Sequence, residues 1–403
     1  MSNIKEKLTF YEFILGAIIV ILTIIGIIMI LSSTIFNPSN PVELNTSIII
    51  KQSFIAILGI GLLIFISTSN SVFNIIRSYV PLIMAFTFMI LVSVYIFGKD
   101  INGAKRWINL PIINFSFQPS ELAKIVVILY TAYYIEKYLN KSEKSIIWYL
   151  FFKKFFFHLA IIFGLIAFQP DLSTAVLVIL TPITLLFIEI KDLKIKHIFL
   201  MMIFGIILLS ILAKIEPYRW ERIKSFYSGD NKEATNYQQW LTTIIIADGN
   251  IIKPNFKKSY KIGLPAKSND FIFALIAEQL GFVLSTFVIL LYMILSLIGF
   301  KLYFILKETF NKLVVLGIIL SISFYTLIHL FVVLSIIPTT GIPLPFISSG
   351  GSSLIINMIA MGIVFNIINR EKQLIEEYQE ESTPIKSVYT EKIEKDLEYE
   401  NIY

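Results

Sequence analysis

Long apolar runs separated by short polar segments dominate the chain. Ten of these runs can cross the roughly 30 Å hydrocarbon core of a bilayer as helices, and they fall at residues 12–33, 50–68, 79–98, 119–137, 155–169, 172–190, 197–215, 271–299, 313–337 and 351–369. Only Gln169-Pro170-Asp171 separates the fifth run from the sixth. We interpret this tripeptide as a tight turn at a membrane surface, with one bent span as the alternative. The pattern predicts an all-α polytopic membrane protein of about ten transmembrane helices, with a long extracytoplasmic loop at 216–270 before the eighth helix.

Composition supports the membrane interpretation. The 403 residues are 56% hydrophobic and 15% charged, whereas soluble chains are about half apolar and about a quarter charged. One core cannot hold this surplus of apolar side chains, so lipid must cover the rest. The first run follows Lys5 and Lys7 and has no small-residue cleavage site, which indicates an anchor rather than a cleaved signal peptide.

The positive charges of the short loops gather on one side of the predicted membrane. The loops 34–49, 169–171 and 338–350 contain no Lys or Arg. The other side carries Lys5, Lys7, Arg77, Lys137, Lys141, Lys144, Lys153, Lys154, Lys191, Lys194, Lys196, Lys301, Lys307 and Lys312. The positive-inside rule therefore places both termini in the cytoplasm, and the same rule explains the net charge of +6 without nucleic-acid binding.

The end of the chain has a different composition. From Arg370 onward there are five Lys or Arg against ten Asp or Glu. We expect residues 1–370 to form the transmembrane domain and residues 371–403 to form a mobile acidic cytoplasmic tail. The Glu-rich helical stretches of this tail are expected to break at Ser382-Thr383-Pro384.

Several kinds of chemistry lack their usual signatures. The chain has no cysteine, which excludes disulfides, thiolate catalysis and Cys-based metal sites. His158, His197 and His329 are far apart in the sequence and form no H-x-x-x-H pair. No Walker loop and no G-x-S-x-G turn is present. ATP hydrolysis and serine-hydrolase chemistry are therefore not indicated.

Polar residues gather at the predicted outer face, first around residues 102–124. Lys105 and Arg106 run against the charge rule there, which suggests a functional use. Pro119 suits the first position of a helix, so Glu121 and Lys124 lie one turn apart on one face. They can form an ion pair, or Lys124 can meet an anionic ligand. Trp107 suits an interfacial anchor or a support for a phosphate or sugar.

Three further outer-face segments carry candidate residues. Asp171 suits an N-cap of the sixth helix, or a group that orients a basic partner. Asp270 can cap the eighth helix, or act as a base at the edge of a low-dielectric region, with Glu278 about 12 Å deeper. The segment 338–353 has three prolines and Gly350-Gly351 before the last helix, which suits either a packed hairpin or an anion at the helix start.

Five motifs in these segments resemble the SEDS family, which comprises the RodA, FtsW and SpoVE type proteins. The family patterns N-G-A-x-R-W, F-Q-P-S-E-L-x-K, Q-P-D-L-x-T, D-F-I-F-A-x-x-x-E-x-L-G and G-I-P-L-P-F-x-S-x-G-G-S-S all occur in order between residues 102 and 353. The resemblance implies a peptidoglycan glycosyltransferase that joins lipid-linked disaccharides (lipid II) outside the cytoplasmic membrane of a bacterium. It also implies a class B penicillin-binding transpeptidase as partner, among divisome or elongasome proteins.

The resemblance also assigns roles to residues. It implies that Asp270 is the catalytic carboxylate. The substrate cavity would be lined by Lys105, Arg106, Trp107, Glu121, Lys124, Asp171, Arg219, Arg222, Glu278, Ser349 and Gly350. Cations near a departing diphosphate would offset its charge. A divalent ion such as Mg²⁺ or Mn²⁺ can assist, although the sequence shows no dedicated cage.

Two other functions compete with the enzyme. A flippase for lipid-linked oligosaccharides would also place Glu278 and Lys124 in the membrane. A scaffold that only activates its transpeptidase is the third hypothesis, because the chain departs from the family pattern at Ser173, Ala247–Asn250, Ser268-Asn269 and Gln279. The Glu216-Pro217-Tyr218-Arg219 stretch and the tail resemble FtsW more than RodA, and this resemblance implies a division role rather than elongation.

Overall fold

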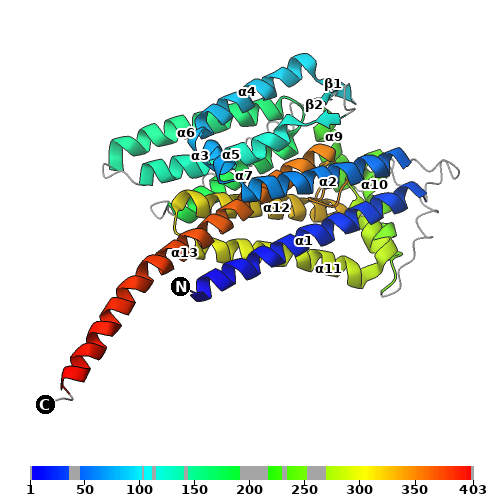
Figure 1. Ribbon diagram of the computed structural model, residues 1–403. Coiled ribbons are helices and arrows are strands. Elements are labelled where there is room, and N and C mark those ends of the chain that lie inside the picture. The colour runs from blue at the N-terminus through cyan, green and yellow to red at the C-terminus, as the bar shows by residue number, and fades with distance from the viewer. Residues whose placement is uncertain are drawn as a thin grey trace.

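The computed structural model describes residues 2–35, 46–101, 104–110, 115–139, 144–190, 217–228, 234–251 and 269–400. Within them the chain forms a bundle of long helices that run roughly antiparallel to one another (Figure 1). The long helices are α1 (Ser2–Ile35), α2 (Thr46–Thr68), α4 (Val80–Phe97), α5 (Pro119–Leu139), α6 (Lys144–Ala167), α7 (Leu172–Glu189), α11 (Ile272–Ile305), α12 (Thr309–Val333) and α13 (Gly351–Glu400). The shorter helices are α3 (Asn70–Ser78), α9 (Pro217–Ser228) and α10 (Ala234–Ala247).

The predicted spans agree with the long helices. The run at 197–215 lies outside the described residues, and each of the other nine coincides with a long helix. Seven described helices are long and apolar enough to cross a membrane. The turn predicted at 169–171 separates α6 from α7, so the alternative of one bent span is wrong. The protein is a helical polytopic membrane protein.

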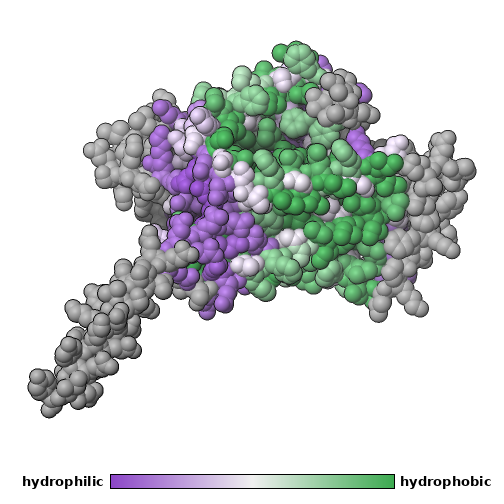
Figure 2. All heavy atoms as spheres, in the orientation of Figure 1, coloured by the Kyte–Doolittle hydropathy of each residue, from purple (hydrophilic) through white to green (hydrophobic). Residues whose placement is uncertain are grey.

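The face of the bundle seen in Figure 2 carries a broad band of apolar residues, which we call the apolar belt. Phe86, Met89 and Phe97 of α4 and Ile57 and Phe65 of α2 are all more than half exposed. Water would make such a surface unfavourable, so it suits the hydrocarbon of a bilayer. Helices α12 and α13 are enclosed by the others, with most of their apolar windows buried.

A small antiparallel sheet lies between α4 and α5, where the all-α prediction expected only a loop. Its strands pair in the order β1 (Lys99–Ile101), β2 (Ala104–Leu110) and β3 (Phe115–Phe117). Pairing within the segment satisfies backbone groups that an open loop would leave to water. Successive side chains of a strand point to opposite faces, so Arg106 lies on one face of β2 and Lys105 and Trp107 on the other.

The predicted outer loop at 216–270 holds helices α9 and α10, and the described residues after α10 pack against a break in α11. Gly281 has φ +81°, which interrupts the helix. The freed N–H groups of Phe282 and Val283 donate to the carbonyls of Asn250 (2.9 Å) and Ile251 (3.2 Å). A Cβ on Gly281 would lie 2.5 Å from the Asn250 carbonyl oxygen, so this crossing requires glycine.

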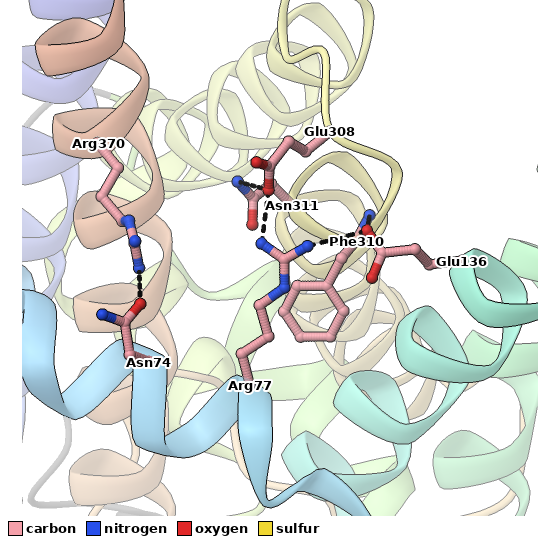
Figure 3. Close-up of polar contacts among 7 residues, drawn as sticks. All are labelled: Asn74, Arg77, Glu136, Glu308, Phe310, Asn311 and Arg370. Atoms are coloured by element: carbon pink, nitrogen blue, oxygen red, sulfur yellow. Dashed lines mark hydrogen bonds and ion pairs between the residues drawn. The ribbon is translucent and has the colours of Figure 1, made fainter. Parts of the chain in front are cut away.

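At the end of the bundle that holds the N-terminus, α3 is tied to three other elements (Figure 3). Arg77 of α3 donates to Glu308, at the start of α12, at 2.6 Å and to Glu136 of α5 at 3.0 Å. Arg370 of α13 donates to Asn74 of α3 at 2.6 Å. These contacts fix the short helix against the bundle.

The last helix extends far beyond the bundle. α13 continues to Glu400 and projects away from the other helices (Figure 1). The helix break expected at Ser382-Thr383-Pro384 is therefore absent. Proline removes one helical hydrogen bond, but the flanking Glu and Lys residues are good helix formers. The mobility of residues 371–403 stays a prediction.

Candidate functional site

Helices α5, α7, α11 and α13 begin at the same end of the bundle. We define the sheet end as the β1–β3 sheet with the first residues of α5, α7, α11 and α13, and it lies opposite the end that holds the N-terminus (Figure 1). The start of a helix leaves backbone N–H groups without helical partners and carries a partial positive charge. A site among four such starts favours negatively charged groups.

Asp171 is held at the start of α7. Its Oδ1 accepts the backbone N–H of Thr174 at 3.4 Å, which confirms the N-cap hypothesis. Its Oδ2 accepts the amide of Gln118, next to α5, at 3.1 Å. Burial raises the pKa of Asp171, while the positive charge of Arg106 lowers it. The carboxylate therefore joins two helix starts and lies near a cation.

The positive charge of Arg106 acts on two acidic residues. From β2 its Nε donates to the Gln169 carbonyl at 3.2 Å, and the guanidinium also donates to the Pro170 carbonyl. Its positive charge lowers the pKa of both Asp171 and Asp270. Arg106, which departs from the positive-inside rule, thus places a guanidinium against the turn that precedes α7.

Asp270 stands immediately before α11 and does not cap it. The N-cap position is Phe271, and no side-chain cap bond is formed, so the capping hypothesis for Asp270 is wrong. Its carboxylate faces the neighbouring loop, where a Cβ on Gly341 would lie 3.8 Å from Oδ2. Burial raises the pKa of Asp270, and the charges of Arg222 and then Arg106 lower it. These surroundings suit a carboxylate that accepts a proton.

The irregular segment at 338–350 supports Asp270. Ser348 Oγ donates to the carbonyl of Asn269 at 2.8 Å, and the Ser349 hydroxyl donates to the Asn269 side chain. Arg222 of α9 donates to the hydroxyl of Thr339 in the same segment. The segment therefore anchors the residue before Asp270 and one of the two arginines whose charge acts on it.

The Glu121–Lys124 pair predicted from helical spacing is formed. Lys124 Nζ lies 2.8 Å from Glu121 Oε2, and both side chains are buried. The ammonium also donates to Asn357 Oδ1 of α13 at 3.0 Å and lies over the ring of Tyr325 of α12. Sequence spacing identifies the ion pair but not Asn357 or Tyr325, which come from helices far along the chain.

The other predicted site residues take varied positions. Lys105 is exposed and Trp107 half-buried on the face of β2 opposite Arg106, and Glu278 is buried within α11. Ser349 and Gly350 are half-buried beside the start of α13. The side chain of Arg219 lies outside the described residues. Gln118 and Thr339 join the site although sequence reasoning gave them no role.

A metal cage is absent from the part of the chain that the structure describes. No group of three or more His, Cys, Asp or Glu there lies close enough to hold an ion. The carboxylates of Asp171 and Asp270 instead share the positive charge of Arg106. The described residues thus do not fit a dedicated divalent-cation site.

Comparison with known proteins gives consistent matches over nearly the whole chain. The family model for FtsW, RodA and SpoVE, described as cell cycle protein, matches residues 13–373. A probable peptidoglycan glycosyltransferase FtsW of Wigglesworthia glossinidia brevipalpis is 32% identical over 90% of this chain and 95% of its own. The stage V sporulation protein E of Bacillus subtilis is 30% identical over 90% of this chain and 98% of its own.

Solved structures share the fold. One chain, from work on the structural coordination of polymerization and crosslinking by a peptidoglycan synthase complex, has a TM-score of 0.71 at 24% identity, covering 90% of this chain and 97% of that one. The rod shape determining protein RodA of Thermus thermophilus has a TM-score of 0.64 at 22% identity, covering 88% and 95%. At 24% and 22% sequence identity, these matches show that the fold is shared.

Proposed function

The chain belongs to the FtsW, RodA and SpoVE family and is a peptidoglycan glycosyltransferase of cell wall synthesis, and we propose that it polymerises lipid II with Asp270 as the general base. The observation that carries the assignment is the setting of Asp270. Burial raises its pKa, and the charges of two arginines act on the same carboxylate. Two other buried carboxylates of the sheet end are already engaged, because Asp171 caps α7 and Glu121 is paired with Lys124.

The reaction needs one base and a compensating positive charge. Asp270 takes the proton of the acceptor sugar hydroxyl as its oxygen attacks the anomeric carbon of the donor. The new carbon–oxygen bond forms while the bond from that carbon to the diphosphate oxygen breaks. The diphosphate leaves with its electron pair, and Arg106 and Arg222 offset the developing negative charge.

Burial and the arginine charges have opposite effects on the pKa of Asp270, and both effects suit a general base. A base works best when its pKa approaches the working pH, because a stronger base takes the proton more readily. Burial supplies that increase, and the arginines oppose it so that the carboxylate stays ionised. The same guanidinium groups are positioned for the leaving group, so base and cations belong to one site.

We propose ten spans and two cytoplasmic termini for this multi-pass protein of the bacterial cell membrane. The short-loop charges support that orientation, because the described basic residues Arg77 and Lys312 lie at the end opposite the sheet end. Asp270 then faces the outside, where glycan strands are needed. The apolar belt would keep the polyprenyl tail of the substrate in lipid beside the site.

We propose that the partner is a class B penicillin-binding transpeptidase. The matched synthase complex couples polymerization to crosslinking, which supports a similar pairing for this chain. Relatives with the name FtsW support work with divisome proteins, and elongation in a RodA-like complex is the alternative.

Polymerisation of lipid II by the purified protein tests this function. We expect the protein with its partner to form long glycan strands, detected after separation by size. Lipid II that crosses vesicle membranes without polymer formation would favour a flippase. Polymer that depends only on the partner's own activity, and is unaffected by every change in this chain's site, would favour a scaffold.

A further inference from the structure

The Glu121–Lys124 pair differs from the other charged groups of the sheet end because both members are buried and paired to each other. The exposed fractions of the two side chains are 2% and 5%, respectively. Both lie in the first turns of α5, a few residues after Gln118, which binds Asp171. An ammonium this deep needs partners for all of its N–H groups.

The protein itself supplies those partners. An ammonium has three N–H donors. One meets Glu121 Oε2 at 2.8 Å and another meets Asn357 Oδ1 at 3.0 Å. The nitrogen also lies 4.5 Å from the centre of the Tyr325 ring, where a cation interacts favourably with the π face. A phosphate oxygen at Lys124 would have to compete with these contacts.

We propose that Lys124 is a positioning residue, which neutralises Glu121 and fixes the start of α5, and is not a ligand of the substrate's diphosphate. This inference rests on the proposed glycosyl transfer. It assigns Asn357 and Tyr325 to the same task, since they complete the set of contacts around the ammonium. The diphosphate is then left to Arg106 and Arg222.

The electrostatic reason lies in the spacing of the acids. The carboxylate of Glu121 acts on Asp171, and Asp171 shares Arg106 with Asp270. Without Lys124, a third negative charge would compete for that guanidinium. Neutralising Glu121 keeps Arg106 available to the two aspartates and to the leaving group.

The geometric reason lies in the helices that meet at the pair. Lys124 joins α5 to α13 through Asn357 and to α12 through Tyr325. A second link runs parallel to it, because the backbone N–H of Gln118 donates to Ser352 of α13 at 3.2 Å. Together they hold Gln118 where its side chain can bind Asp171.

A charge-pair exchange separates positioning from direct binding. We compare lipid II polymerisation by Lys124→Met with that by the double variant Glu121→Gln with Lys124→Met. The single variant leaves a buried carboxylate without its cation, and we expect about a 10²-fold loss of kcat. The double variant removes both charges, and we expect activity within about tenfold of wild type with KM for lipid II unchanged.

A folded double variant that is as inactive as Lys124→Met would overturn the proposal that Lys124 acts by neutralising Glu121, because removing both charges would then restore nothing. The matched control is Glu189→Gln with Lys312→Met, which removes a pair at 2.7 Å at the opposite end of the bundle. It should leave kcat unchanged. Thermal unfolding and size-exclusion profiles report whether each variant is folded.

Tyr325 provides a second test that does not depend on removing a charge. Its hydroxyl is buried and has no hydrogen-bond partner among the described residues. Tyr325→Phe keeps the ring face for Lys124, whereas Tyr325→Leu removes it. We expect Phe to be about tenfold more active than Leu. Equal loss in both variants would show that the hydroxyl matters instead, and would contradict the role given to the ring.

These outcomes are distinct from failure of the proposed function. If wild type makes no polymer with its partner present, the glycosyltransferase mechanism fails first. If wild type polymerises lipid II but the double variant or the Tyr325 pair behaves otherwise than expected, the glycosyltransferase mechanism stands and only the positioning role falls.

Discussion

At the scale of single residues, the sequence predicts local contacts well and distant ones poorly. Spacing alone identifies the Glu121–Lys124 pair and the cap by Asp171, because both are set within one or two helical turns. It does not identify Asn357, which reaches Lys124 across 233 positions of sequence. It also leaves open whether Asp270 is a cap, a question that backbone geometry decides.

The acid limb of the pH–rate profile tests the surroundings of Asp270. The charge of Arg222 lowers the pKa of this carboxylate, so Arg222→Gln should raise that pKa further. Activity requires the ionised form, which is lost as pH falls through the pKa. The acid limb of kcat/KM should therefore move to higher pH, beyond any overall loss of rate. Lys224→Gln, an exposed position on the same helix, is the control, and an equal shift there would contradict the prediction.

At the scale of elements, apolar length predicts the long helices but not what the polar segments between them form. The β1–β3 sheet and helices α9 and α10 lie in segments that were predicted as loops. The break in α11 could not be predicted either, because a single Gly281 within an apolar run is compatible with a continuous helix. The break depends on a tertiary contact, because the N–H groups of Phe282 and Val283 bond to the carbonyls of Asn250 and Ile251 instead of to carbonyls within the helix.

Replacing Gly281 tests that arrangement. Gly281→Ala places a Cβ at positive φ and 2.5 Å from the Asn250 carbonyl oxygen. We expect a loss of about 1–3 kcal/mol of unfolding free energy, seen as a lower thermal unfolding midpoint in detergent. Gly164→Ala in α6 meets no atom within 4 Å and is the matched control. A midpoint as low for Gly164→Ala as for Gly281→Ala would argue against the crossing.

At the scale of the whole molecule, the order of spans follows from the sequence, but the pairing of helices does not. Apolar periodicity does not reveal that α12 and α13 are the enclosed helices, because lipid-facing and core-facing residues are both apolar. Ion pairs in the structure show which helices are neighbours. Arg77 joins α3, α5 and the start of α12, far apart in sequence but adjacent in the fold (Figure 3).

Loss of Arg77 tests how firmly that end of the bundle is held. Arg77→Gln leaves Glu136 and Glu308 without their shared cation, and we expect a loss of about 1–3 kcal/mol of stability. Lys5→Gln removes an exposed pair with Glu376 and should cost about 0–1 kcal/mol. Thermal unfolding of the two variants under one set of conditions gives the comparison. Equal midpoints would mean that this partly exposed cluster adds nothing beyond a surface pair.

Polymerisation of lipid II by Asp270→Asn tests the central claim most directly. The substitution keeps the size and polarity of the side chain but removes its ability to accept a proton. With the partner present, we predict no glycan strands from Asp270→Asn at normal expression and unfolding temperature, while the exposed Asp248→Asn retains wild-type activity. Undiminished polymer from Asp270→Asn would contradict the assignment of the base.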